Sequence, residues 1–144
     1  MKGYPKHFKT VLLSTFAALV ASGLTLAPGL LMFRLDLDVP DWASPFERTS
    51  VAAIHVGAAL LTCFFVGSLW SIHMRTGWKR RKNHRSGTLL CTAFLVLAAS
   101  GLGGLYFGDE LLARGNAIVH LSAGIILPSI LIFHSLAWRR RRNQ

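Results

Sequence analysis

Four long stretches of the chain contain no aspartate, glutamate, lysine or arginine. They run from Thr10 to Phe33, from Thr49 to Met74, from Ser86 to Gly108 and from Gly115 to Trp138. Because an α-helix rises about 1.5 Å per residue, each stretch is long enough to cross a hydrocarbon core about 30 Å thick. The pattern predicts an all-α membrane protein. Residues 1–144 are expected to form a single four-helix transmembrane bundle, with helices over about 10–33, 50–74, 87–107 and 116–138.

The first and third stretches resemble each other. TVLLSTFAALVASGL, which starts at Thr10, aligns with TLLCTAFLVLAASGL, which starts at Thr88, at a constant offset of 78 residues. In each half of the chain, a histidine-free apolar stretch is followed by one with two histidines and then by a basic segment. We therefore expect the bundle to be built from two repeated helical hairpins, related by an axis along the membrane normal.

The second and fourth stretches contain two histidines each, His55 and His73 in one and His120 and His134 in the other. At about 100° per residue, the 18 residues between the first two complete five turns, and the 14 between the others fall about 40° short of four turns. Each pair therefore lies on one face of its helix. Polar groups inside a membrane are costly and usually functional, so four histidines matched in face and depth indicate a site.

Two imidazoles opposite each other, at each of two depths, are typical of bis-histidine haem ligation. A zinc site would need three or four ligands at one level, and the apolar stretches contain no acid. The two cysteines lie on different predicted helices, without the Cys-x-x-Cys-His motif of covalent haem. We predict two b-type haems, one ligated by His55 and His120 and the other by His73 and His134.

The spacing of the histidines places these haems near opposite membrane faces. The two pairs are about 27 Å and about 21 Å apart along their helices, so electrons could cross the membrane between the haems. A flat macrocycle also needs neighbours without bulk. Gly23 and Gly101 are equivalent in the repeat, and Gly87 precedes Gly101 by the ligand spacing of 14 residues. We predict that Gly23 and Gly101 contact the haems, although small residues also serve ordinary helix packing in membranes.

The pattern of histidines and glycines resembles that of known haem proteins. Four helices, with histidine pairs on the second and fourth and glycines on the first and third, are similar to the haem core of the cytochrome b of quinol:cytochrome c oxidoreductases. They also resemble the small bacterial di-haem cytochrome b subunits that anchor periplasmic dehydrogenases. The resemblance covers all four predicted spans. It implies a subunit of a respiratory electron-transport complex in the bacterial cytoplasmic (inner) membrane, with quinone as a further cofactor or partner.

Two features depart from these families. The spacing of His120 and His134 matches the families, whereas His73 lies one helical turn further from His55, and Leu69 occupies the expected position. Subunits of the formate-dehydrogenase type take a ligand from the first helix, and here His7 lies outside the first predicted helix. The haem nearer the basic side therefore has the less regular ligand pattern.

Composition and charge give the surroundings and the orientation. The chain is 52% hydrophobic and 15% charged, and a soluble domain typically carries about 25% charged residues. Thirteen of the 16 basic residues lie before the first stretch, between the second and third, or after the fourth, and all six acids lie in the other two connections. The positive-inside rule then places both termini in the cytoplasm. These basic residues adjoin helix ends and lipid headgroups, so the net charge of +10 does not predict nucleic-acid binding.

The remaining arginines and some helix-end cations are candidate partners of the haem propionates, because buried carboxylates need a cationic partner. The candidates are Arg34, Arg48 and Arg114 on the acidic side and Arg75 and Lys79 on the basic side.

The connecting segments are too short for a flavin, iron-sulfur or molybdenum domain, so we predict one subunit of a redox complex without a complete active site of its own. The longest outer segment, RLDLDVPDWASPFERTS, starts at Arg34 and carries four acids with Trp42 and Phe46. It is a candidate docking surface for a periplasmic haem or metal protein that exchanges electrons with the His55 and His120 haem. Quinone is expected to react near the His73 and His134 haem.

Two other functions stay open at the level of sequence. The histidines could carry protons in a small proton-coupled transporter or channel, or the chain could be a cofactor-free anchor. An oxidised-minus-reduced optical spectrum separates a haem protein from both.

Overall fold

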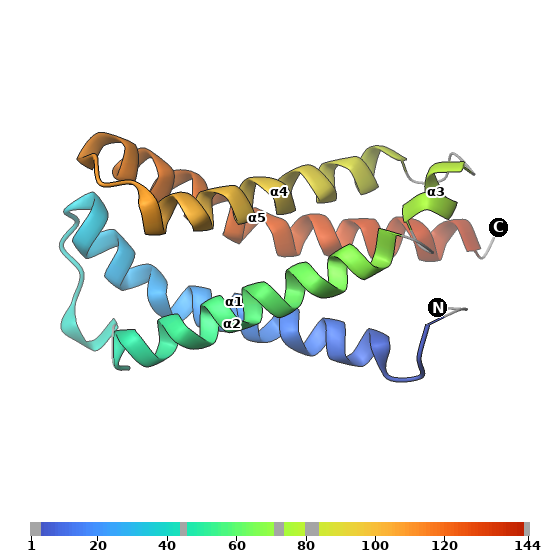
Figure 1. The fold of residues 1–144 in the computed structure, drawn as a ribbon, viewed down its shortest axis with the longest axis horizontal. Helices are drawn as coiled ribbons and strands as arrows, with labels where there is room; N and C mark the ends of the chain where they lie inside the picture. The colour runs from blue at the N-terminus through green and yellow to red at the C-terminus, as the bar shows by residue number, and fades with distance from the viewer. Residues whose placement is uncertain (1–3, 44–45, 71–73, 80–83, 143–144) are drawn as a thin grey trace. The chain divides into compact units, whose positions relative to one another are not determined.

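The structure is a computed structural model, and it describes residues 4–43, 46–70, 74–79 and 84–142. These residues form α-helices and one 3₁₀ turn, with no strand among them. The elements are α1 (Phe8–Leu35), η1 (Asp41–Ala43), α2 (Arg48–Leu69), α3 (Arg75–Lys79), α4 (His84–Tyr106) and α5 (Glu110–Arg142) (Figure 1). The all-α fold with four long apolar helices that the sequence predicts is confirmed.

The chain divides into two compact units, Met1–His73 and Met74–Gln144. In the first unit α1 packs antiparallel along α2, and in the second α4 packs antiparallel along α5 (Figure 1). Each unit is thus a helical hairpin, as the internal repeat predicts. The short helix α3 belongs to the second unit and precedes α4.

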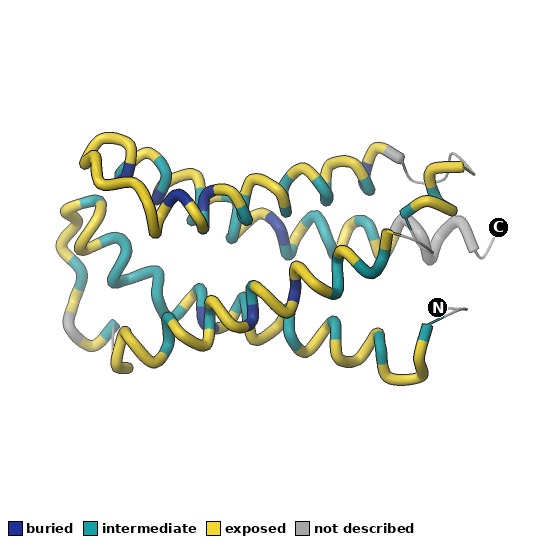
Figure 2. Tube along the Cα trace, viewed as in Figure 1, coloured by how far each residue is buried: buried dark blue, intermediate teal, exposed yellow. Residues whose placement is uncertain are grey.

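The four long helices have the length and composition of membrane spans. Among the described residues, the candidate spans are Phe8–Leu35, Arg48–Leu69, Arg85–Tyr106 and Glu110–Leu136. Large apolar side chains cover their outer faces, for example Leu60, Phe64, Leu95 and Leu105, each about two-thirds exposed or more. Few positions are buried (Figure 2). Such a surface is suited to lipid and not to water, because exposed apolar patches of this extent are rare on soluble monomers.

Small and polar residues occupy the buried positions of the hairpins. In the first hairpin these are Ser22, Ala58 and Thr62, and in the second they include Ser86, Ser100 and Leu127. Small residues let two helix backbones approach closely in a membrane, where no hydrophobic effect separates helix from lipid. The interface within each hairpin is therefore built on close approach and on hydrogen bonds.

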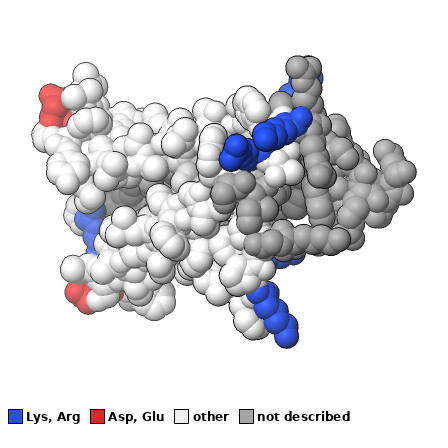
Figure 3. Space-filling model, turned by 45° about the vertical axis from the view of Figure 1, so that its right-hand side comes forward, with Lys and Arg blue, Asp and Glu red and all other residues white. Residues whose placement is uncertain are grey.

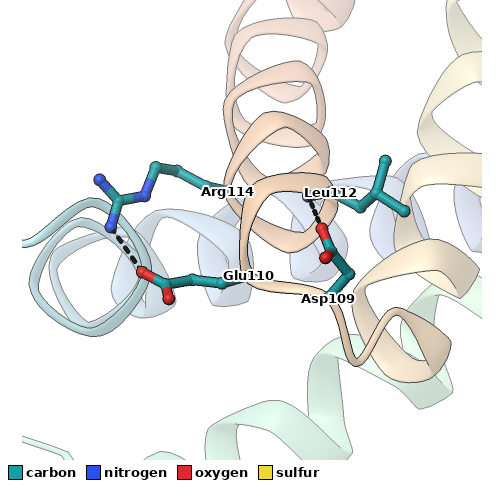
Figure 4. A network of polar contacts seen from close by, with 4 residues as sticks. All are labelled: Asp109, Glu110, Leu112 and Arg114. Atoms are coloured by element: carbon teal, nitrogen blue, oxygen red, sulfur yellow. Dashed lines mark hydrogen bonds and ion pairs between the residues drawn. The ribbon is translucent and has the colours of Figure 1, made fainter.

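Local chemistry sets the helix ends. Asp36, which follows α1, has φ 52°, and its backbone N–H bonds to the Leu31 carbonyl, a left-handed cap that an aspartate tolerates better than most residues. At the start of α5, Asp109 Oδ1 accepts a hydrogen bond from the Leu112 N–H at 2.9 Å (Figure 4). This contact satisfies one of the unpaired N–H groups of the first turn.

The helix bounds differ from the expected ones where polar residues extend or stop a helix. Helix α5 begins at Glu110, six residues before the predicted start, because Asp109 caps it. Helix α2 ends at Leu69, before the predicted end at 74, and the next backbone N–H, that of Trp70, bonds to Gly67, three residues back. The α-helical hydrogen-bond ladder therefore stops one turn short of the charge-free stretch.

Charged side chains mark the two ends of the hairpins. The acids Asp36, Asp38, Glu47, Asp109 and Glu110 lie at or next to the α1–α2 and α4–α5 connections, and Figure 3 shows acidic side chains at those ends. Lys6, Lys9, Arg75 and Lys79 lie at the opposite helix ends. Within each hairpin, the charge asymmetry that the sequence analysis used is therefore an asymmetry along the helix axis.

Candidate functional site

Three of the candidate histidines lie against a serine-glycine pair on the neighbouring helix of their own hairpin. The nitrogen Nδ1 lies 2.9 to 3.0 Å from the serine Oγ in each case. The sets are His55 with Ser22 and Gly23, His120 with Ser100 and Gly101, and His134 with Ser86 and Gly87. All three serines are buried. One local arrangement thus recurs at three places within the apolar helices.

The contacts of His55 identify which ring nitrogen carries the proton. Its Nδ1 lies 3.1 Å from the carbonyl oxygen of Leu19, which can only accept a hydrogen bond, and 3.0 Å from Ser22 Oγ. The Ser22 hydroxyl itself donates to the Ala18 carbonyl at 2.7 Å, so its oxygen is an acceptor for the imidazole. Nδ1 of a neutral His55 therefore bears the hydrogen, and Nε2 bears the lone pair.

The same logic applies to His120. The Ser100 hydroxyl donates to the Leu97 carbonyl at 3.2 Å, so Ser100 Oγ accepts the hydrogen of His120 Nδ1 at 2.9 Å. Asn116, one turn before His120 on α5, donates from Nδ2 to the Ser100 carbonyl at 2.8 Å. His120 and His55 thus share one tautomer, and each is held by a serine on the other helix of its hairpin.

The glycines leave the space that the imidazoles occupy. A Cβ at Gly23 would lie 3.0 Å from Cε1 of His55, one at Gly101 would lie 3.4 Å from Cε1 of His120, and one at Gly87 would lie 3.8 Å from Cε1 of His134. The closest of these is tighter than an ordinary van der Waals contact. The predicted role of Gly23 and Gly101 in admitting a haem edge is untested, but each makes room for the neighbouring ring.

The second hairpin keeps one register over both of its histidines. Moving 14 residues from Ser100–Gly101 to Ser86–Gly87 along α4 matches the move from His120 to His134 along α5. In the first hairpin, the same move from Ser22–Gly23 and His55 leads to Phe8 and Leu69.

Aromatic packing takes the place of a histidine there. Phe8 lies edge-on to Phe65, with ring centroids 5.6 Å apart, and the Tyr4 hydroxyl donates to the Leu69 carbonyl at 3.4 Å. His73 lies outside the described residues. The described part of the first hairpin therefore presents one serine-held histidine, and the second presents two.

Among the outer arginines, Arg48 is the one placed on the histidine face. Arg48 and His55 are seven residues apart on α2, which is two turns, so both project from the same side. The Arg48 guanidinium lies over the Phe33 ring, 4.9 Å from its centroid, and its stem runs past Gly29. These residues line a small open cavity of about 190 Å³ together with Thr25, Leu26, Phe46 and Val51.

The other predicted cations lie in different surroundings. Arg114 forms an ion pair with Glu110 on the surface of α5, with nitrogen and oxygen 3.1 Å apart (Figure 4). Arg34 is exposed in the last turn of α1, and Arg75 and Lys79 are exposed on α3. His7, the histidine outside the first predicted helix, is the N-cap residue of α1.

Ser22, Ser86, Ser100 and Asn116 are the functional candidates that the sequence analysis missed. A signal for the serines was present, because Ala-Ser-Gly-Leu closes both copies of the repeat and Ser86–Gly87 precedes Ser100–Gly101 by the ligand spacing. The glycines of these pairs were noted for their size, and the hydroxyl beside each one was not considered. Asn116 has no counterpart in the first hairpin and gave no such signal.

The chemistry of the site must be inferred from these contacts. Within the described ranges, no three or more His, Cys, Asp or Glu side chains gather closely enough to hold a metal ion. No family model, curated protein sequence or solved structure matches the chain.

Proposed function

We propose that the protein is a membrane-embedded electron-transfer subunit that carries two bis-histidine b-type haems. In this proposal His55 and His120 ligate the haem near the acidic ends of the hairpins, called the outer haem. His134 ligates the second, inner haem near the basic ends, and His73 is its second ligand by the sequence prediction. Electrons pass between quinone or quinol and a redox partner protein.

The observation that carries the proposal is the pair of hydrogen bonds that His55 Nδ1 makes to the Leu19 carbonyl and to Ser22 Oγ. Metal-bound histidines almost always donate the other ring N–H to a carbonyl, a carboxylate or a similar acceptor, which fixes the tautomer and the ring orientation. With its proton on Nδ1, His55 offers the Nε2 lone pair to a metal. His120 has the same tautomer through Ser100.

The haem, once bound, supplies reversible one-electron chemistry at its iron, and the chain supplies the rest. The serines hold the imidazoles at a fixed angle and raise their basicity by accepting Nδ1–H. The apolar helix faces keep the region dry. The glycines allow the rings to lie close to α1 and α4.

The two serine contacts should tune the outer haem unequally. Ser100→Ala removes the only printed acceptor of His120 Nδ1, whereas Ser22→Ala leaves the Leu19 carbonyl to His55. A lost hydrogen bond of about 1 kcal/mol that favours the ferric state corresponds to roughly 40 mV for one electron. We expect Ser100→Ala to raise the outer midpoint potential by tens of millivolts and Ser22→Ala to raise it by less.

A spectroscopic redox titration of the purified variants measures both shifts. Thr15→Ala is a matched control, because the Thr15 hydroxyl bonds to carbonyls of its own helix, those of Val11 and Leu12, and to no histidine. Equal potentials in Ser100→Ala, Thr15→Ala and the wild type would show that the serine contact does not reach an iron ligand.

Arg48 is the best placed of the outer cations to bind a haem propionate. It shares a helix face with His55, its guanidinium is oriented by Phe33, and it lines a cavity. Among the described residues, no carboxylate forms an ion pair with it, whereas Arg114 pairs with Glu110. A cation that is held in place but not neutralised by the chain is suited to a buried carboxylate.

We expect Arg48→Gln to lower haem affinity at the outer site several-fold, because a charge-assisted hydrogen bond contributes about 1.5–3 kcal/mol when it is shielded from water and less when it is partly exposed. Arg34→Gln and Arg114→Gln are matched controls, and both should retain wild-type affinity. The measurement is haem retention on detergent washing of each variant. Greater loss in Arg114→Gln than in Arg48→Gln would assign the propionate contact to α5 instead.

The location and the partners follow from charge. The basic helix ends are proposed to face the cytoplasm of a bacterium and the acidic connections its periplasm, by the positive-inside rule. Trp42 and Phe46 are exposed beside the acids of the α1–α2 connection, 80% and 65% respectively, which suits a docking surface for a periplasmic haem or metal protein. Quinone is proposed to react at the inner haem.

A further inference from the structure

Asn116 is a polar side chain within an apolar helix to which the proposed function gives no role. Its Nδ2 donates to the Ser100 carbonyl at 2.8 Å, and Ser100 Oγ accepts from His120 Nδ1 at 2.9 Å. Asn116 and His120 are four residues apart on α5 and thus lie on one face. Two successive turns of α5 therefore bond to two different atoms of one residue on α4.

Two glycines of α4 accommodate the Asn116 amide. A Cβ at Gly103 would lie 2.6 Å from Asn116 Oδ1, a distance that atoms do not tolerate, and 2.7 Å from Cε2 of Phe107. Phe107 is 44% exposed and has room to turn, whereas Asn116 is short and held by its hydrogen bond. A Cβ at Gly104 would lie 3.6 Å from Asn116 Nδ2, which is an ordinary contact. The two adjacent glycines therefore differ sharply in their tolerance of a methyl group.

The first hairpin has no such arrangement. Val51 stands four residues before His55, and the positions that correspond to Gly103 and Gly104 in the repeat are Thr25 and Leu26. Ser22 and His55 nevertheless hydrogen-bond at 3.0 Å. The amide is thus an addition to the serine-histidine contact in one hairpin and not a general requirement of it.

We propose that Asn116 is a positioning residue that acts on His120 through Ser100. Because it fixes the Ser100 carbonyl, the Ser100 hydroxyl stays aligned between the Leu97 carbonyl and the imidazole. The Nδ1–H···Oγ bond then stays short, and the imidazole remains a strong electron donor. The consequence for the outer haem, a lower midpoint potential than it would otherwise have, rests on the proposed function.

The test compares Asn116→Val, which installs the residue of the first hairpin, with Gly103→Ala and its neighbour Gly104→Ala. All three are made in the full chain with His134 replaced by alanine, so that the outer haem alone is titrated. Asn116→Val and Gly103→Ala should raise the midpoint potential, whereas Gly104→Ala should leave it unchanged. In a Ser100→Ala background Asn116→Val should add little, because its effect passes through the Ser100 hydroxyl.

A purely structural role for Asn116 gives a different set of results. It predicts lower thermal stability with no change in potential, or a shift that adds fully to that of Ser100→Ala, and either result overturns the proposal. If the wild-type chain binds no haem, the proposed function fails by itself. Nitrogen-15 NMR of the histidine rings then still tests the network, because only Asn116→Val and Gly103→Ala should weaken the Nδ1–H hydrogen bond of His120.

Discussion

Replacing His120 by alanine should leave the protein with one haem per chain instead of two, because a bis-histidine iron that loses one ligand on each molecule no longer retains its haem through detergent purification. The haem that remains should be the inner one, which His134 ligates. His55→Ala should give the same loss and the same remaining spectrum. Haem content by the pyridine haemochrome assay, together with protein concentration, measures this outcome directly.

Double variants separate the proposed pairing from its alternatives. If His55 and His120 share one iron, the double alanine variant retains one haem, whereas His55→Ala combined with His134→Ala retains none. His7→Ala is the matched control, because His7 is the N-cap of α1 and lies outside the apolar helices, and it should keep both haems. A haem-free His55→Ala, His120→Ala protein would contradict the pairing.

Alanine substitutions in the three glycine positions should lower haem affinity in a graded order. At Gly23 the new methyl group would lie 3.0 Å from Cε1 of His55 and must push the ring away from its hydrogen-bond acceptors. Overpacking of a tight site costs about 1–3 kcal/mol, which is roughly a 5- to 150-fold loss of affinity if the cost falls on ligand geometry. We therefore expect Gly23→Ala to be the most damaging of the three.

The other two positions act as internal controls. Gly101→Ala meets His120 at 3.4 Å and should have an intermediate effect, and Gly87→Ala meets His134 at 3.8 Å and should be nearly neutral. Haem titration into the purified variants, followed by the low-spin spectrum of the bound haem, measures the order. A larger effect at Gly87 than at Gly23 would show that the glycines serve the haem face directly and not the position of the imidazole.

Much of the fold follows from the sequence because the membrane imposes strong rules on it. A run such as Thr10 to Phe33 without a charged residue has few options other than a spanning helix, and α1 covers it with two further residues at each end. The repeat predicts the two hairpins for the same reason. Helix ends are less predictable, because they depend on single contacts such as the Asp109 cap of α5 and the Trp70 bond that ends α2.

The candidate site was predictable in its ligands and not in their supports. Histidines stand out in apolar helices because burial of a polar group has a high cost, whereas serine is common in membrane helices and usually bonds to its own helix. Ser22 does so as well, and only the fold shows that its oxygen also accepts from His55. The choice of Arg48 over Arg114 likewise depends on Glu110, which lies one turn from Arg114 and pairs with it.

The central claim, that the histidines ligate haem iron, is tested most directly by the reduced-minus-oxidised optical difference spectrum of the purified wild-type protein. The account predicts the sharp α and β bands of low-spin, six-coordinate b-type haem, with an amplitude that corresponds to two haems per chain. A difference spectrum without haem bands, from protein expressed with adequate haem supply, would contradict it.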